Sequence, residues 1–205
     1  MRAALSPEEL LALIVATSFA AGLNVYATVA TLGLLSRAGM VTLPPALGVL
    51  DSWWVIVPCA ALFAIEFVAD KVPAFDLIWN ALQTFVRVPV GALLAYGASA
   101  PLAPGWQLAA AALGAVIALA AHGGKTAARA AVTASPEPFS NAALSLGEDA
   151  FAIFITWFAT RHPYAAAAIV MACLIVIVLL VRWIVRALRA LFAGARGQLA
   201  TSGRP

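Results

Sequence analysis

The run from Leu10 to Ser36 contains no charged residue, and this restricts the fold of the chain more than any other feature. A membrane-spanning helix needs roughly 20 predominantly apolar residues, and the run exceeds that length. Hydrophobic residues make up 64% of the chain and charged residues 10%, whereas charged residues are about 25% of a typical soluble domain. The sequence therefore predicts an integral membrane protein whose outer surface faces lipid.

Further apolar runs predict an all-α, polytopic bundle of about six spans. Ser6 followed by Pro7 predicts a helix start, because serine caps the N-terminus and proline fits the first turn. The expected spans are residues 10–36, 53–69, 88–100, 106–121, 141–160 and 164–181. We expect one membrane domain with a three-span half at residues 1–104 and a second at 105–205, which ends in a basic tail.

Two arrangements fit the amphipathic segment Pro73–Arg87. Residues 74–87 could lie along the membrane interface or form a bent entry into the third span. We favour the bent entry, broken at Pro89, because proline removes a helical hydrogen bond.

The distribution of basic residues predicts the orientation. With six spans, the outer side holds only Arg37 and Arg161, which satisfies the positive-inside rule. We therefore expect both termini in the cytoplasm and the chain in a bacterial cytoplasmic (inner) membrane. The cytoplasmic positions hold Arg2, Lys71, Arg87, Lys125, Arg129 and the C-terminal arginines from Arg182 onward.

Short internal similarities suggest two inverted three-helix repeats, an architecture of many transporters. The loop with Pro44-Pro45 and Asp51 resembles the later stretch with Pro136, Pro138 and Asp149. Superposition of the two halves about an axis in the membrane plane is the test of this interpretation.

Charged residues between the apolar runs are the candidate functional residues. Glu66 and Asp70 lie four residues apart, so a continuing helix places both carboxylates on one face, where like charges repel. Such a pair survives near a bilayer by sharing a proton, binding a cation or pairing with bases. The candidate ligand-binding or ion-binding residues are Asn24, Glu66, Asp70, Lys71, Asp76, Arg87, Lys125, Arg129, Glu148 and Asp149.

Two interpretations of this set stay open: a polar cavity for a cation, a proton or an anionic group, or salt bridges that fix the helices. The turn SPEPFSN at residues 135–141 is either an interfacial turn or a gate near Lys125 and Arg129. His122 and His162 are expected to be polar residues at helix ends. We predict no catalytic residue, metal site or cofactor, because the chain contains no motif of those kinds.

Four segments together resemble a bacterial membrane-protein family, the domain of unknown function 4126. They are GLNVYATV (22–29), EFVADKVPAFDLIW (66–79), TFVRVPVGALLA (84–95) and KTAARAAVTASPEPFSNAALSLGED (125–149). The resemblance covers roughly residues 10–180 and implies a small polytopic membrane protein. It supplies no catalytic residues.

The expected function is transport or permeation of a small solute or ion through a polar intramembrane cavity. Glu66, Asp70 and Asp149 would bind a cation or proton, with Arg87, Lys125 and Arg129 as counter-charges. The alternative is a membrane scaffold that binds a partner or organises lipid, and an enzyme acting on lipid head groups is a third interpretation. The expected partners are the lipid bilayer and a small ion or solute, without nucleic acid; a homo-oligomer is compatible with the sequence.

Overall fold

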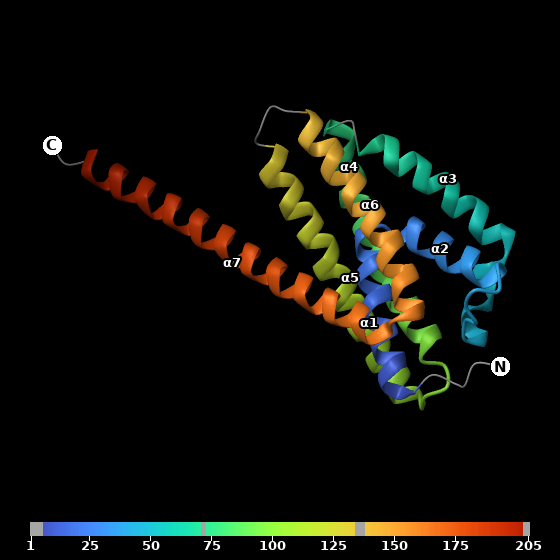
Figure 1. The fold of residues 1–205 in the computed structure, drawn as a ribbon. Helices are drawn as coiled ribbons and strands as arrows, with labels where there is room; N and C mark the ends of the chain where they lie inside the picture. Colours follow the sequence, from blue (N-terminus) through green and yellow to red (C-terminus); the bar gives the residue numbers. More distant parts are fainter. Residues whose placement is uncertain (1–5, 71–72, 134–137, 203–205) are drawn as a thin grey trace.

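The computed structural model describes the backbone of residues 6–70, 73–133 and 138–202, which form a bundle of helices without a strand in those ranges (Figure 1). The all-α prediction is therefore confirmed. The elements are α1 (Pro7–Leu23), α2 (Val25–Arg37), the 3-10 helix η1 (Pro45–Asp51), α3 (Trp53–Ala69), α4 (Pro73–Ala98), α5 (Pro104–Thr133), α6 (Pro138–Arg161) and α7 (Pro163–Ser202).

Helix α1 lies at the centre of the bundle and packs against α4, α5, α6 and α7. It begins as predicted at Ser6, whose hydroxyl accepts a hydrogen bond from Glu9 while the Glu9 carboxylate accepts one from the Ser6 backbone. Small residues let neighbouring helices come close: a Cβ placed on Gly22 would lie 2.4 Å from the backbone oxygen of Ala118. This close approach is typical of helix contacts in membranes.

The expected continuous span at residues 10–36 is wrong, because the helix breaks at Asn24. This residue has an extended backbone (φ −150°, ψ 103°) and separates α1 from α2. Its side-chain oxygen accepts a hydrogen bond from the Ala27 backbone at 2.9 Å and thereby caps the new helix. Hydropathy could not reveal this break, since the residues on both sides are apolar.

Within the described residues, four helices are long and apolar enough to cross a membrane, and the pair η1 and α3, bent by 62°, makes a fifth candidate. The four are residues 78–98 of α4, 104–129 of α5, 142–161 of α6 and 163–187 of α7. These helices support an integral membrane protein. The six spans, the division at residue 104 and the inverted repeat stay predictions.

Two expected boundaries in the middle of the chain are wrong. Pro89 does not break the third span, because α4 continues through it from Pro73 to Ala98 and thus includes residues 74–87. Helix α5 does not end near Ala121 but continues to Thr133. Both extensions bring charged residues into helices of the bundle.

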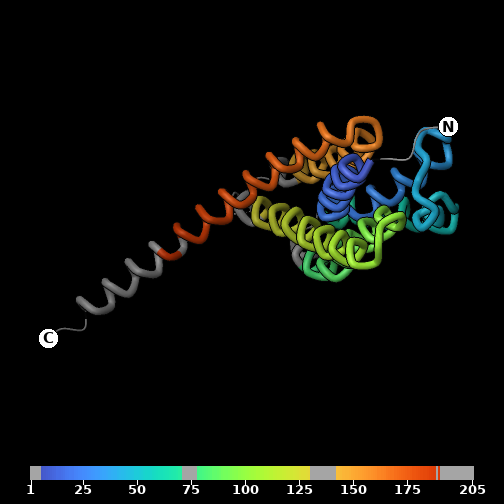
Figure 2. Tube along the Cα trace, turned by 90° about the horizontal axis from the view of Figure 1, so that it is seen from below, coloured from blue at the N-terminus to red at the C-terminus, as the bar shows by residue number. Residues whose placement is uncertain are grey.

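Helix α7 leaves the bundle, and its C-terminal part projects far beyond the other helices (Figures 1 and 2). Its first turns pack against α1, α5 and α6. Arg182, Arg186 and Arg189 lie on the projecting part, and the side chains of Arg182 and Arg186 are exposed.

Candidate functional site: a buried charge cluster

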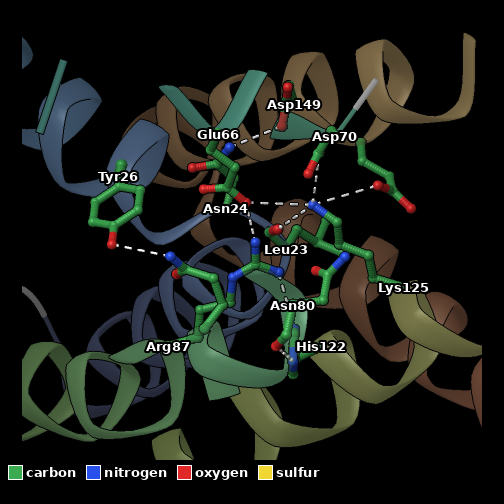
Figure 3. Close-up of polar contacts among 12 residues, drawn as sticks. Leu23, Asn24, Tyr26, Glu66, Asp70, Asn80, Arg87, His122, Lys125 and Asp149 are labelled. Atoms are coloured by element: carbon green, nitrogen blue, oxygen red, sulfur yellow. Dashed lines mark hydrogen bonds and ion pairs between the residues drawn. The ribbon is translucent and has the colours of Figure 1, made fainter. Parts of the chain in front are cut away.

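Seven charged side chains from four helices meet inside the bundle. Figure 3 labels five of them, Glu66, Asp70, Arg87, Lys125 and Asp149. We call this group the charge cluster. Two of its members lie four residues apart at the end of α3, and two others lie four residues apart on α5. Each pair therefore shares one face of its helix. The members are Glu66 and Asp70 at the end of α3, Arg87 of α4, Lys125 and Arg129 of α5, and Glu148 and Asp149 of α6.

Arg87 and Glu66 form a fully buried ion pair, and both side chains are 0% exposed. The Arg87 guanidinium also donates from Nη1 to the carbonyl oxygen of Gly22 at 3.3 Å. Its third partner is the Nδ1 atom of His122 at 3.0 Å. The arginine therefore connects α3, α5 and the last turn of α1.

Lys125 lies at the centre of the cluster (Figure 3). Its Nζ atom is 3.6 Å from Glu66 Oε1, 3.6 Å from Asp70 Oδ2 and 3.5 Å from Glu148 Oε2. The same ammonium donates to the carbonyl oxygen of Leu23 at 3.2 Å. One base thus offsets several carboxylates and holds the C-terminal end of α1.

Arg129 joins α3 to α6. Its Nη2 atom is 2.6 Å from Asp70 Oδ2 and 2.9 Å from Glu148 Oε2. The Ser145 hydroxyl donates to the same Asp70 oxygen at 3.0 Å. Charge-assisted bonds of this kind are stronger than neutral ones, so this part of the cluster fixes the two helices together.

Asp149 differs from the other carboxylates. Its Oδ1 atom accepts a hydrogen bond from Asn24 Nδ2 at 2.8 Å, and no base of the described residues lies within ion-pair distance of it. Its other oxygen, Oδ2, has no hydrogen-bond partner among those residues. Asn24 is 0% and Asp149 2% exposed, so bulk solvent does not hydrate either side chain.

His122 belongs to the site, and the expectation of a helix-end residue is wrong. Because arginine only donates, Nδ1 of His122 accepts from Arg87. The proton then lies on Nε2, which is 3.1 Å from the Asn80 carbonyl oxygen and 2.8 Å from Thr84 Oγ1. The imidazole is therefore neutral. Its spacing of three residues before Lys125 was the available signal, because it places both on one face of a helix.

A polar extension of the cluster reaches α2. Gln83, one turn before Arg87 on α4, donates from Nε2 to the Tyr26 hydroxyl at 3.1 Å. Gln83 recurs at helical spacing with Asp76, Asn80 and Arg87, which was the available signal, but the same pattern is typical of a solvated face.

Two predicted site residues are not placed. Lys71 lies outside the described residues, and Asp76 belongs to α4 while its side chain lies outside the described part. Residues 134–137 of the predicted SPEPFSN gate are likewise outside it. The other eight candidates come together in or beside the cluster, although ligand binding by them is untested.

The composition of the cluster limits its chemistry. Three bases face four carboxylates, and the neutral His122 adds no charge. The described part therefore carries an excess of one carboxylate. Within that part, no group of three His, Cys, Asp or Glu side chains is arranged to hold a metal ion. One proton or one monovalent cation would neutralise this excess.

Comparison with known proteins identifies a family. No curated protein and no solved structure matches the chain. The family model described as "Domain of unknown function (DUF4126)" matches residues 11–183. This range includes the helix break and every member of the charge cluster, and it covers most of the chain. The chain therefore belongs to the DUF4126 family.

Proposed function

We propose that this membrane protein transports a small solute or ion, with the charge cluster as the site that binds the solute or the coupled ion. The observation that carries the proposal is the break between α1 and α2, which lies inside the bundle and against the cluster. Many secondary transporters place ion and substrate sites at discontinuous helices, whose free backbone groups bind the cargo.

The end of α1 supplies such backbone groups. The carbonyls of Gly22 and Leu23 have no partner further along the helix, because Asn24 leaves the helical conformation. Arg87 donates a hydrogen bond to the Gly22 carbonyl and Lys125 donates one to the Leu23 carbonyl. Both bases are also paired with carboxylates of the cluster. A change in the charge of one carboxylate therefore alters the bonds that hold the helix break.

The energetic cost of the cluster also supports a functional role. Transferring charges from water into a low-dielectric interior is expensive, and well-packed apolar residues often stabilise a fold equally well. Charged residues inside membrane segments are accordingly typical of ion and substrate pathways. The burial of Glu66, Asp70 and Arg87 at 0% exposure makes this cost large here.

The proposed location rests on the asymmetry of basic residues. Lys125, Arg129 and the C-terminal arginines lie toward one side of the six-span arrangement, which supports cytoplasmic termini in a bacterial inner membrane. A reporter fused after Pro205 that is active only in the periplasm would contradict this orientation.

Transport is tested with the full chain reconstituted in liposomes on a solid-supported membrane. Rapid exchange to monovalent cations, small organic anions or zwitterions is applied with and without a pH step. We expect a transient current for at least one class of solute. The current should disappear in Glu66→Gln and in the charge-neutral double variant Glu66→Gln/Arg87→Met, which leaves neither charge of that pair uncompensated.

The matched control is Asp51→Asn, which removes a carboxylate outside the cluster. The backbone oxygen of Asp51, which accepts a hydrogen bond from Arg37, is unchanged in this variant. This variant should retain the current. Folded wild-type protein that gives no current with any solute, or a double variant with full current, would refute the proposal.

A scaffold function is the second candidate, and the density of ion pairs favours it. Arg129 pairs with both Asp70 and Glu148, an arrangement that also suits a fixed joint between helices. The scaffold predicts that no solute raises the melting temperature and that the Glu66→Gln/Arg87→Met variant keeps its function. The transport proposal predicts the opposite for both.

A further inference from the structure

We propose that Asp149 carries a proton on Oδ2 in the resting protein and that Asn24 and Lys125 couple the release of this proton to the α1–α2 break. The proposal deepens the transport function and rests on it for the coupling, because it names the proton as the coupled ion. The pairing pattern of the cluster carries the proton assignment, and the orientation of the Asn24 amide identifies the oxygen that holds the proton.

The pairing pattern selects Asp149 among the carboxylates. Glu66 has Arg87, while Asp70 and Glu148 share Arg129 and Lys125. Within the described part of the chain, Asp149 has only the neutral amide of Asn24 as a partner, at 2.8 Å. An ionised carboxylate buried without a base costs far more than its neutral form, so the buried group binds a proton instead.

The orientation of Asn24 determines which oxygen of Asp149 is available for the proton. Its oxygen is occupied by the Ala27 backbone N–H, so its amide nitrogen must face Asp149. The amide donates to Oδ1, which leaves Oδ2 as the oxygen that holds the proton. That oxygen has no acceptor or donor among the described residues.

The charges around Asp149 determine how the cluster responds when the proton leaves. Two bases of α5, Lys125 and Arg129, add positive charge near Asp149. Two carboxylates of α3, Glu66 and Asp70, add negative charge. Helix α7 has no charged side chain between residues 164 and 181. Glu148 neighbours it on α6, while α1 and α2 present Asn24. All bases of this set are engaged with other carboxylates.

Release of the proton therefore recruits a base from an existing pair. The O–H bond of Asp149 breaks, the proton passes to water, and the negative charge stays on the carboxylate. Lys125 is the least committed base, because its contacts with carboxylates are 3.5 to 3.6 Å long. Its movement toward Asp149 would weaken its bond to the Leu23 carbonyl and free the end of α1 beside Asn24.

Infrared spectroscopy of the purified full chain at neutral pH tests the site. A protonated buried carboxyl group gives a carboxylic-acid C=O stretching band that shifts in heavy water. We expect this band in the wild type and in the control Asp51→Asn, which removes a carboxylate outside the cluster, and its complete loss in Asp149→Asn. Absence of the band in the wild type, or its survival in Asp149→Asn, would overturn the proposal.

A second variant covers the case in which Asp149→Asn does not fold. Asn24→Ser keeps an oxygen that can cap α2 but removes the amide nitrogen that donates to Asp149, so the band should move to higher frequency. An unchanged band would contradict the Asn24–Asp149 contact as the proton site. Replacing sodium with a large organic cation should leave the band unchanged; loss of the band in sodium would instead indicate a cation site and overturn the proton assignment.

The flux assay separates this inference from the proposed function. If the carboxylic-acid band depends on Asp149 but no solute gives a current, the proton site is supported and transport is refuted. A current that depends on Glu66, without a band on Asp149, would leave transport intact and refute the proton site.

Discussion

Helices α1 and α7 are similar in sequence character and opposite in environment. Both are strongly apolar and begin at a proline. Helix α1 is buried along most of its length, and its buried positions include several alanines together with Ser18 and Gly22. In α7, only 11% of the most apolar stretch is buried, and its exposed positions carry large aliphatic side chains such as Ile175 and Leu179.

The difference shows that hydrophobicity does not distinguish the inside of this protein from its lipid-facing surface. In a bilayer, lipid tails are as apolar as leucine, so helix contacts depend on small residues and hydrogen bonds. In α1, small residues share the buried faces with larger apolar ones, whereas the exposed positions of α7 carry mainly large apolar side chains. Substitutions in the two environments test that contrast, from the largest expected effect to the smallest.

Substitution of Gly22 by leucine should prevent folding. The new Cβ would lie 2.4 Å from the Ala118 backbone oxygen and 2.7 Å from Ala121 Cβ. A backbone oxygen cannot move aside, so the cost exceeds the about 1–3 kcal/mol of ordinary overpacking. Size-exclusion chromatography in detergent should show loss of the monodisperse peak. The control Gly123→Leu, where the added Cβ meets no atom within 4 Å, should keep it.

Substitution of Arg87 by methionine should cost about 3–5 kcal/mol, because Glu66 is left as a buried and poorly compensated charge. Combining it with Glu66→Gln should recover most of the loss, since the uncompensated charge is then absent. Thermal unfolding in detergent measures both variants. Equal destabilisation of the single and double variants would mean that packing of the arginine, rather than its charge, holds α4 in place.

Substitution of Asn24 by alanine should cost about 1–2 kcal/mol, because it removes the cap of α2 and the donor to Asp149. The melting temperature should fall by about 2–4 °C for each kcal/mol in a chain of this size. Hydrogen exchange should increase most in the first turn of α2. Increased exchange confined to α7 would place the effect outside the helix break.

Substitution of Ile175 by alanine should change stability by less than about 0.5 kcal/mol, because its side chain is 57% exposed and contacts mainly lipid. The same change at Ile155 of α6, which is 0% exposed, should cost about 2–5 kcal/mol. Similar melting temperatures for the two variants would show that α7 is covered by protein rather than by lipid, for example by a second copy.

The overall class of the fold was predictable because composition and run length decide it. The bounds of Trp53–Ala69 agree with the expected second span. The break at Asn24 was not predictable from hydropathy, since an asparagine within an apolar run also occurs as a polar contact between continuous helices. At Pro89 the error was the opposite one. Proline predicts a break, but α4 continues through Pro89, and its packing against α1 and α5 stabilises the continuous helix.

The charge cluster was predictable in membership and only partly in arrangement. Charges that recur every four residues in apolar surroundings had to face the interior, and Glu66, Asp70, Lys125 and Arg129 do so. The pairing between them depends on how the helices are oriented, which one sequence does not contain. For that reason the special position of Asp149 and the participation of His122 emerged only from the three-dimensional structure.

The way in which α3 is attached has a mechanical consequence. Only Ile56, Glu66 and Ala69 of this helix are buried, so apolar contact alone holds it weakly. At its far end, Arg37 lies 4.6 Å above the Trp53 ring, and at its near end the attachment is electrostatic. Helix α3 is thus held mainly at its two ends. Neutralising the bases that pair with Glu66 and Asp70 would free its C-terminal end, and the helix could then rotate about the Arg37–Trp53 contact at its N-terminal end.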